Sequence, residues 1–268
     1  MVYKSWRTER TSSRIKGINN KMKDLILITI WQIFLLLFLI KKDKNSGEKE
    51  LFKNQHWKAS DVIITVLFID ALKFIFYYLS KIDSMHLLLR NNFYLFHLIL
   101  FIFVIGLFKF KFKQSLKVLG FKKNDFKKSM GIGIVVALIS YLIYHILYLS
   151  IGPSSYTLNV IEKLRTMNFS FYFIQYIITG IILVPVVEES ISRGISYSPY
   201  RKKYGSKVAI ILTSLLFASF HFEIGFISFF IIGILLGILY EKTESLVSPI
   251  VAHSVYSLLG ILAMAYVL

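Results

Sequence analysis

The sequence predicts an all-α, polytopic membrane protein with about eight transmembrane helices. Hydrophobic residues make up 56% of the 268 residues, and the mean hydropathy is +0.62. Soluble domains usually contain roughly 45–50% apolar residues. The apolar residues are also grouped into stretches, several of which approach the ~20 residues that a helix needs to cross a bilayer. Composition and grouping together exclude an ordinary soluble domain.

The candidate transmembrane stretches follow one another along the chain, separated by short and mostly basic connections. Seven are free of charged residues, and the second contains Asp70 and Lys73. These two residues lie three positions apart on one helical face, so we expect them to form an internal ion pair. The eight stretches are residues 25–40, 62–80, 91–108, 129–161, 166–187, 208–222, 224–240 and 245–268.

The chain is expected to form one integral membrane domain, because no linker rich in proline, glycine or serine divides it. Residues 1–23 form a basic N-terminal segment, and residues 24–165 carry the N-terminal transmembrane helices. Residues 166–268 form a membrane core that holds nearly all of the informative polar groups. Within this core, Gly233 and Gly237 form a G-x-x-x-G pattern, which favours close packing of another helix. The pattern does not determine the oligomeric state.

The net charge of +17 comes from basic residues that lie between the apolar stretches. Eight lysines gather in residues 109–128, without the pattern of aromatic and basic residues typical of RNA binding. We therefore expect the lipid bilayer, with its anionic head groups, as the partner of these residues and expect no nucleic acid. The absence of cysteine excludes disulfides, cysteine nucleophiles and thiolate metal sites.

The basic connections also predict an orientation. Residues 41–58, 109–128 and 201–207 should be cytoplasmic under the positive-inside rule. With eight spans the N-terminus would then lie outside, against its own seven positive charges, so either stretch 25–40 does not cross fully or the rule fails there. Frequent lysine and isoleucine indicate an AT-rich bacterial genome. We therefore expect a multi-pass protein of the bacterial cytoplasmic membrane.

Two adjacent glutamates, Glu188 and Glu189, directly follow the fifth apolar stretch. If the helix ended before them, both would be ordinary interfacial charges. Helix-compatible residues continue, however, to the basic group at Arg201, which predicts a helix of about thirty residues with the acids nearer its middle. Carboxylates at that depth are functional candidates by default. Pro185 would kink this helix, and Arg193 would pair with Glu189 four residues earlier.

Two histidines complete the candidate set. His221 follows a phenylalanine by four residues, and His253 precedes Ser257 by four, so each pair shares a helical face. A lone histidine near a helix end is more often an interfacial residue with its hydrogen bonds satisfied than a catalytic acid or base. Neither histidine alone therefore indicates a catalytic site. His97 and His145 lack polar companions at helical spacing, and we interpret them as structural.

Two carboxylates, two histidines and an arginine on neighbouring helices supply the groups needed for hydrolysis by an activated water. A glutamate takes a proton from the water, while a histidine orients that water or protonates the leaving amine. A second histidine or a hydroxyl donates to the oxyanion. Glu188, His221 and His253 would also serve as zinc ligands. No H-E-x-x-H sequence is present, so the spacing does not require a metal.

At these residues the chain resembles the CAAX-protease and bacteriocin-processing membrane proteins, also called the Abi family, which include the type II CAAX prenyl endopeptidases. The family motif E-E-x-x-x-R matches Glu188, Glu189 and Arg193. The second motif, F-x-x-x-H, matches Phe217 and His221. A glycine-rich stretch then leads to the third motif. The resemblance covers roughly residues 170–260.

The third motif departs from the family pattern. It usually reads H-x-x-x-N or H-x-x-x-D, whereas this chain has His253 followed by Ser257. Serine still donates a hydrogen bond, but its side chain reaches less far. The sequence SISRG also lacks the aromatic residue that commonly precedes the arginine of the first motif. These departures predict weakened, altered or lost activity.

The resemblance implies an intramembrane endopeptidase that cleaves a membrane-associated peptide or protein with glutamate-activated water. The site residues that it implies are Glu188 as the base, His221 as its partner, Glu189 and Arg193 as the positioning pair, and His253 with a weakened Ser257 as oxyanion-side donors. Because bacteria lack general prenylation, we expect a leader peptide or small membrane peptide rather than a prenylated substrate.

The alternative is a non-catalytic family member that acts as a bacteriocin immunity factor or as a membrane scaffold or regulator. Ser257 favours this alternative, whereas the retained glutamates, arginine and histidines favour an enzyme. A transporter ranks third, because no second half of the chain mirrors the polar site.

Overall fold

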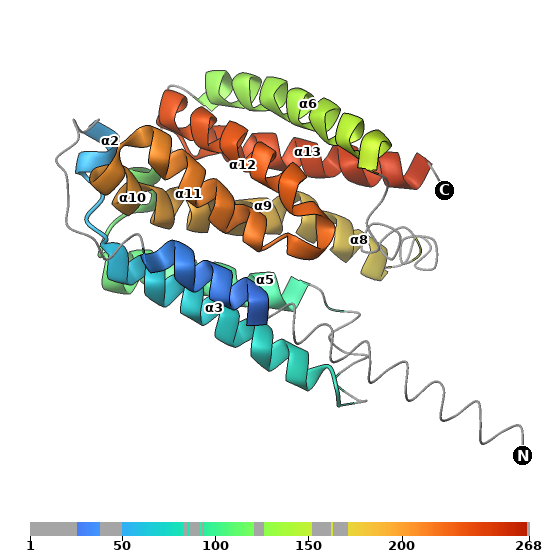
Figure 1. Cartoon of the computed structure of the whole chain (residues 1–268), viewed down its shortest axis with the longest axis horizontal. Coiled ribbons are helices and arrows are strands. Elements are labelled where there is room, and N and C mark those ends of the chain that lie inside the picture. The colour runs from blue at the N-terminus through green and yellow to red at the C-terminus, as the bar shows by residue number, and fades with distance from the viewer. Residues whose placement is uncertain are drawn as a thin grey trace, which may run out of the picture.

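The computed structural model describes residues 26–37, 50–82, 94–120, 126–151 and 171–266, together with the single positions 85, 92 and 162. The predicted basic segment 1–23 lies outside the described residues. Within them every regular element is helical, which confirms the predicted all-α class. Figure 1 shows a bundle whose helices run mostly along its long axis.

Five described helices are long and apolar enough to cross a membrane, and three shorter apolar helices accompany them. Together they agree with the eight predicted spans. The five are Ala59–Leu79, Tyr94–Lys111, Phe126–Ile146, Phe173–Tyr204 and Gly225–Thr243. The three are Ile26–Leu37, Ser206–Ser219 and Val247–Ala263.

Figure 1 labels the α-helices from α2 to α13. After the helix Ile26–Leu37 come α2 (Glu50–Lys53), α3 (Ala59–Leu79), α5 (Tyr94–Gly106), the π-helical turn η1 (Leu107–Lys111), the 3-10 turn η2 (Leu116–Leu119) and α6 (Phe126–Ile151). The C-terminal elements are α8 (Phe171–Ile178), η3 (Thr179–Leu183), α9 (Val184–Glu189), η4 (Ser190–Ser196), α10 (Tyr197–Tyr204), α11 (Ser206–Ser219), α12 (Phe222–Thr243) and α13 (Val247–Tyr266).

The elements from α8 to α10 form one continuous helix, and its membrane-spanning part, Phe173–Tyr204, has 32 residues. The sequence allowed either a helix that ends before the glutamates or a longer one that continues to the basic group at Arg201. The longer helix is present, and Glu188 and Glu189 lie at its midpoint. This helix contacts α3, α5, α11 and α13, so it occupies the centre of the bundle. Both glutamates consequently have protein on several sides rather than lipid or a membrane surface.

Two π-helical turns, η3 and η4, flank the glutamates within this helix. Pro185 has no backbone N–H, so an α-helix cannot continue through it without losing a hydrogen bond. In η3 the N–H of Val184 instead donates to the carbonyl of Thr179, five residues earlier. In η4 every residue is buried, including Arg193. Such π turns are rare and frequently occur at functional sites.

The glycine pattern of α12 packs against α11. A Cβ atom at Gly233 would lie 3.0 Å from the Cβ of Ser214, and one at Gly237 would lie 3.2 Å from the side chain of Ile210. A larger residue could fit at either position only if its neighbour moved. The predicted packing role of the pattern is therefore fulfilled within the chain.

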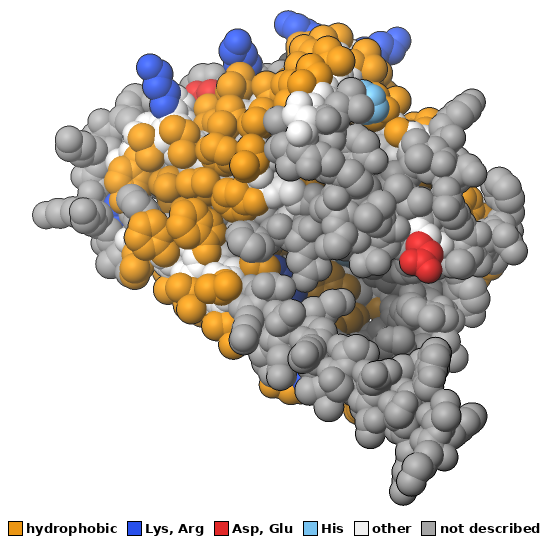
Figure 2. Space-filling view, turned by 45° about the vertical axis from the view of Figure 1, so that its right-hand side comes forward, with side chains coloured by type: hydrophobic (Ala, Val, Ile, Leu, Met, Phe, Trp, Pro, Cys, Tyr) orange, Lys and Arg blue, Asp and Glu red, His pale blue; other side chains and the backbone are white. Residues whose placement is uncertain are grey.

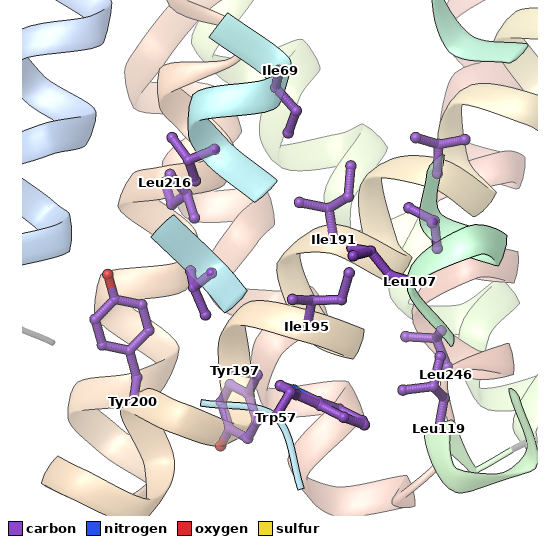
Figure 3. Close-up of a cluster of buried hydrophobic side chains, with 14 of the residues drawn as sticks. Trp57, Ile69, Leu107, Leu119, Ile191, Ile195, Tyr197, Tyr200, Leu216 and Leu246 are labelled. Carbon is purple, nitrogen blue, oxygen red and sulfur yellow. The ribbon is translucent and has the colours of Figure 1, made fainter. Parts of the chain in front are cut away.

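A large hydrophobic cluster joins the N-terminal helices to the C-terminal core. Figure 3 shows Ile191 and Ile195 of η4 in this cluster, together with Ile69, Leu107 and Leu216 from other elements. All five side chains are buried. Because interiors are closely packed, this contact fixes the rotation of η4 and therefore the direction of the polar side chains on the same helix.

The three basic connections predicted to be cytoplasmic lie at the same end of the bundle. Gln114 Nε2 donates to the carbonyl of Asn54 at 2.9 Å. Gln55 Nε2 donates to the carbonyl of Val118 at 3.2 Å, and Lys202 Nζ donates to the carbonyl of Gln55 at 2.7 Å. These bonds join the described parts of all three connections, so they lie together at one end of the bundle.

The helix Ile26–Leu37 runs toward this basic end from the opposite one. The ring of Trp31 meets Phe226, beside the turn between α11 and α12, with centroids 6.4 Å apart. Four residues later, the carbonyl of Leu35 accepts a hydrogen bond of 2.9 Å from the hydroxyl of Tyr200 on α10. This direction is the one that an eight-span arrangement with an external N-terminus requires.

Hydrophobic side chains cover much of the described surface in the view of Figure 2. Large apolar residues on the outside of the bundle are more than half exposed, among them Ile102, Leu142 and Ile182. A soluble monomer rarely exposes so much contiguous apolar surface. The outside of the bundle therefore suits the hydrocarbon core of a membrane.

Candidate active site

Glu189 and Arg193 form a buried ion pair at the centre of the bundle. Arg193 Nη1 lies 3.1 Å from Glu189 Oε1 and 3.0 Å from Oε2, and both side chains are 0% exposed. Arg193 Nη2 also donates to the carbonyl of Gly233 at 2.8 Å, which ties the pair to α12. The spacing of four residues predicted this pair. Because removal of either partner would leave a buried charge, the pair is held as a unit.

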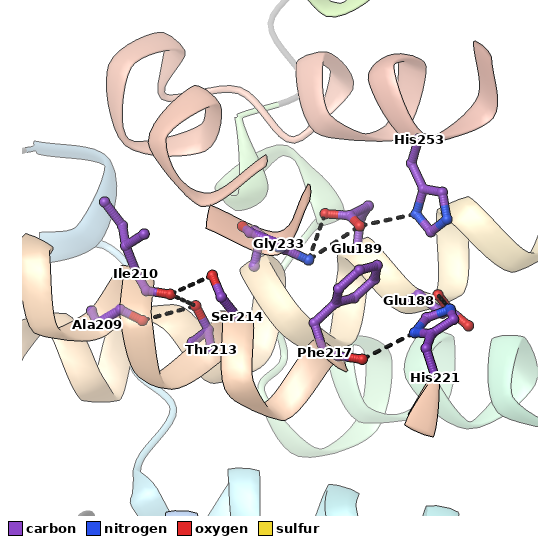
Figure 4. A network of polar contacts seen from close by, with 11 residues as sticks. Glu188, Glu189, Ala209, Ile210, Thr213, Ser214, Phe217, His221, Gly233 and His253 are labelled. Carbon is purple, nitrogen blue, oxygen red and sulfur yellow. Dashed lines mark hydrogen bonds and ion pairs between the residues drawn. The ribbon is translucent and has the colours of Figure 1, made fainter. Parts of the chain in front are cut away.

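His253 joins the same pair from α13. Its Nδ1 atom lies 3.1 Å from Glu189 Oε1, and the ring is buried. An ionised carboxylate only accepts hydrogen bonds, so Nδ1 carries a hydrogen and donates it. Figure 4 shows Glu189 between the backbone of Gly233 and the ring of His253. The remaining ring nitrogen, Nε2, is left for another partner.

Glu188 faces a different histidine. Its Oε2 atom lies 3.4 Å from Nε2 of His221, and the two side chains are 15% and 9% exposed. Nδ1 of His221 lies 3.0 Å from the carbonyl of Phe217, so Nδ1 carries a hydrogen and Nε2 of the neutral ring is an acceptor. Two acceptors therefore face each other. A water molecule that donates one hydrogen to each would satisfy both.

The turn between α11 and α12 fixes the position of His221. The chain reverses there through Gly225, whose φ of 145° is accessible to glycine and strained for other residues. The ring of Phe229 stacks on that of His221, with centroids 4.0 Å and planes 6° apart. The stacking and the bond to the Phe217 carbonyl together direct Nε2 toward Glu188.

Phe217 lies between the two glutamate–histidine pairs. The guanidinium carbon of Arg193 is 4.7 Å from the centroid of the Phe217 ring, a cation–π contact. The His253 ring meets the same ring edge-on at 5.6 Å, and His221 lies 4.8 Å from it. One aromatic side chain therefore holds both pairs at a fixed separation, which gives the phenylalanine of the second motif a physical role.

Ser257 stands apart from this group. It lies half-buried on α13, one turn after His253, and it forms no hydrogen bond with any of the described residues. Five of the six predicted site residues therefore come together through direct contacts, and the serine at the position of the departing motif does not.

The histidines and glutamates do not converge as zinc ligands. His221 and His253 contact different glutamates, and no three His, Asp or Glu side chains in the described part of the chain meet around one point. A catalytic zinc ion needs three protein ligands at about 2.0–2.2 Å. The set Glu188, His221 and His253 does not fit zinc in this arrangement.

Polar side chains of the N-terminal helices reach the same region. Lys73 of α3 and His97 of α5 both interact electrostatically with Glu188. The predicted internal ion pair is confirmed, with Lys73 Nζ 4.0 Å from Asp70 Oδ1. Spacing along the chain did not connect Lys73 or His97 with Glu188, because the three residues lie on separate helices. The sequence offered one indication that Lys73 is unusual, namely that Lys73 and Asp70 are charged residues inside an otherwise apolar stretch.

The three motifs lie in a part of the chain that matches a known family. Residues 169–259 match the family model described as type II CAAX prenyl endopeptidase, Rce1-like. This region contains all three motifs, and the match confirms for it the resemblance to CAAX proteases and supports a protease-like enzyme. No curated protein and no solved structure gives a significant match. Lys73 and His97 lie outside the matched region.

Proposed function

We propose that this chain is an intramembrane endopeptidase in which Glu188 activates a water molecule to attack a peptide bond. The observation that carries the proposal is the contrast between two adjacent glutamates. Glu189 is fully buried and held by Arg193 and His253, whereas Glu188 is partly exposed and faces His221. A catalytic base needs a path for water and a neighbouring acid–base group. Glu188 has His221 beside it, and its side chain is 15% exposed, while its Oε2 atom is buried without a hydrogen-bond partner among the described residues.

The Glu188–His221 pair is suited to activate water. A water molecule that donates one hydrogen to Glu188 Oε2 and the other to His221 Nε2 has its oxygen lone pairs free for attack. Glu188 takes the first proton as the oxygen bonds to the carbonyl carbon of the substrate. His221 orients the water, since its ring is fixed by Phe217 and Phe229, and such positioning lowers the barrier.

The attack places a negative charge on the former carbonyl oxygen. Glu189 accepts the Nδ1 hydrogen of His253 and so fixes the ring, and Nε2 of this ring, when it carries a hydrogen, donates to this oxygen. Protonated Glu188 passes its proton to the nitrogen of the scissile bond, and the C–N bond breaks. One water is consumed, a carboxylic acid and an amine are released, and Glu188 is again ionised.

A membrane-associated peptide or protein is the substrate class that suits this location. Glu188 lies at the midpoint of the spanning helix Phe173–Tyr204, so the scissile bond has to enter the bundle below the membrane surface. We expect an extended leader peptide or a small membrane peptide, because a peptide bond within a regular helix is shielded from attack by its own hydrogen bonds.

Cleavage by the purified protein in liposomes of phosphatidylethanolamine and phosphatidylglycerol tests the proposal. One probe is an apolar, non-prenylated membrane peptide, and the other is a farnesylated C-a-a-X peptide, both followed by mass spectrometry. We expect the wild type to cleave at least one probe and Glu188→Gln to lose that activity. Glu162→Gln, at an exposed position, is the matched control and should cleave normally. Cleavage that persists in Glu188→Gln would contradict the proposal.

A non-catalytic role as a bacteriocin immunity factor or membrane scaffold is the second candidate, and Ser257 favours it. This residue occupies the place of the usual asparagine or aspartate and forms no hydrogen bond with the described residues. Under this alternative no probe is cleaved, and cells that express Glu188→Gln resist a bacteriocin as well as those that express the wild type.

A further inference from the structure

Gln32 is a fully buried amide in the first described helix, Ile26–Leu37. A buried amide inside a membrane bundle is costly unless its polar atoms find partners. The partners of Gln32 are Asp70 of α3 and Ser219 of α11. An ionised carboxylate only accepts hydrogen bonds, so the amide nitrogen lies toward Asp70, 2.8 Å from both carboxylate oxygens. The amide oxygen consequently lies toward Ser219.

The contact between Gln32 and Ser219 connects the first helix to the last turn of α11. The amide oxygen lies 2.9 Å from Ser219 Oγ, which donates to it. The same Oγ lies 2.6 Å from the carbonyl of Leu216 in its own helix, so its single hydrogen has two acceptors within reach. Through its two partners, the Gln32 side chain ties the first helix, α3 and α11 together.

The turn that contains His221 has two further contacts with the N-terminal helices. The ammonium of Lys73 on α3 lies 4.7 Å from the ring centroid of Phe220, the residue directly before His221. The ring of Trp31 on the first helix meets that of Phe226, five residues after His221, at 6.4 Å. Together with the buried amide, these contacts hold the chain on both sides of His221.

This support differs from the contacts that His221 makes within its own hairpin. The bond to the Phe217 carbonyl and the stacking on Phe229 fix the ring relative to α11 and α12. Glu188 lies on a different element, the central helix, so its distance to His221 also depends on where the tip of the hairpin lies. Because α3 packs on η4 of the central helix as well, a tie from α3 to the end of α11 bears on this distance.

We propose that Gln32 is a positioning residue of the active site. By binding Asp70 and Ser219 together, it holds the end of α11 against α3 and keeps Nε2 of His221 directed toward Glu188. This inference rests on the proposed function and extends the site to a helix outside residues 169–259, the part that matches the family model. A displacement of about 1 Å in a positioned group can cost about 100-fold in rate.

Hydrogen exchange of the full chain in detergent, followed by mass spectrometry, tests the tie without any substrate. Gln32→Met and Ser219→Ala each remove one side of the contact. We expect both to speed exchange in residues 217–226 about fivefold, the factor expected for loss of one typical hydrogen bond, and to leave α13 unchanged. Unchanged exchange of residues 217–226 in either variant overturns the proposal. If Gln32→Met does not assemble, Ser219→Ala decides alone, because it leaves the contact of Gln32 with Asp70 in place.

The chain offers a matched control for each substitution. Gln114→Met removes an amide that donates to the Asn54 carbonyl at the basic end of the bundle. Ser150→Ala removes an exposed hydroxyl that donates to the Ile146 carbonyl of its own helix, as Ser219 does to Leu216. Both controls should leave exchange in residues 217–226 unchanged. An equal increase in the controls overturns the proposal.

Cleavage of the peptide probe, at a temperature at which each variant is folded, tests whether the tie positions His221. Gln32→Met and Ser219→Ala should each lower kcat about tenfold or more with little change in KM. The double variant should be no slower than the slower single variant, because both substitutions break the same tie. Losses that multiply, a wild-type kcat in Ser219→Ala, or equal losses in the two controls overturn the proposal. If the wild type cleaves neither probe, the proposed function fails, while hydrogen exchange still decides whether Gln32 holds the turn.

Discussion

Glu188 and Glu189 are neighbours in the sequence, yet their side chains enter different surroundings. Successive residues of a helix point about 100° apart, so one carboxylate meets α13 and the other meets the turn after α11. Glu189 is fixed by Arg193 and His253, and Glu188 is left with His221 and partial exposure. Contrasting environments of two nearby carboxyl groups are typical of acid–base sites.

The ion pair of Glu189 should carry a large part of the local stability. Arg193→Ala leaves a buried carboxylate without its cation, and we expect a loss of about 3–5 kcal/mol in the free energy of unfolding. Thermal unfolding in detergent measures the change. Lys207→Ala removes a positive charge from an exposed position and serves as the matched control. Equal melting temperatures for the two variants would count against the pair as a structural unit.

Ser257 is the residue at which the site departs from the pattern of the family that residues 169–259 match. If the parent protein cleaves peptides with a weakened oxyanion side, Ser257→Asn should raise kcat, because asparagine supplies a longer donor. The gain should approach ~100–1,000-fold, the loss that follows removal of one such donor. Ser257→Ala should leave the parent rate nearly unchanged, since the hydroxyl has no hydrogen-bond partner among the described residues. An unchanged rate in Ser257→Asn would place this residue outside the site.

Contacts within one helix could be predicted at the residue level, and contacts between helices could not. The spacing of Glu189 and Arg193 predicted their pair directly. Gln32 and Ser219, by contrast, are 187 residues apart, and no spacing rule relates them.

At the level of elements, composition predicted the long central helix but not the irregularities of its backbone. The apolar and helix-compatible residues continued to Arg201, and the spanning helix ends close by, at Tyr204. The π turns on both sides of the glutamates have no comparable sequence pattern. Pro185 indicated an irregularity in η3, whereas the buried residues of η4, Ser190–Ser196, include no proline that could have indicated a second one.

The close contact of α11 and α12 should depend on Gly233. Gly233→Ala places a Cβ atom 3.0 Å from Ser214 and should destabilise the protein by about 1–3 kcal/mol through overpacking. It should also lower activity, because the Gly233 carbonyl binds Arg193. Gly131→Ala on α6 meets nothing within 4 Å and should instead stabilise its helix by up to ~1 kcal/mol. Equal effects of the two substitutions on Tm would contradict the close-packing role.

At the level of the whole molecule, charge in the sequence predicted the sidedness of the bundle. The three basic connections are joined by hydrogen bonds at one end, and His221 lies toward the other. The N-terminal helices carry no recognisable motif, yet they pack on η4. Their contribution depends on tertiary packing, which no local pattern encodes.

The absence of cysteine makes this sidedness directly measurable. Single cysteines at Lys117 and Lys207 mark the basic end, and one at Ile82, which is 52% exposed, marks the opposite end. In intact bacterial cells a membrane-impermeant maleimide should label Ile82→Cys and should label the other two variants only after lysis. Labelling of all three in intact cells, or the reverse pattern, would contradict the orientation.

The joint action of Glu188 and His221 on one water is tested most directly by a kinetic double-mutant cycle on the cleaved probe. We expect Glu188→Gln and His221→Gln each to lower kcat by about 100-fold or more. Because the two residues activate the same water, the double variant should be no slower than the slower single variant. Losses that multiply in the double variant, or a wild-type kcat in either single variant, would contradict the mechanism.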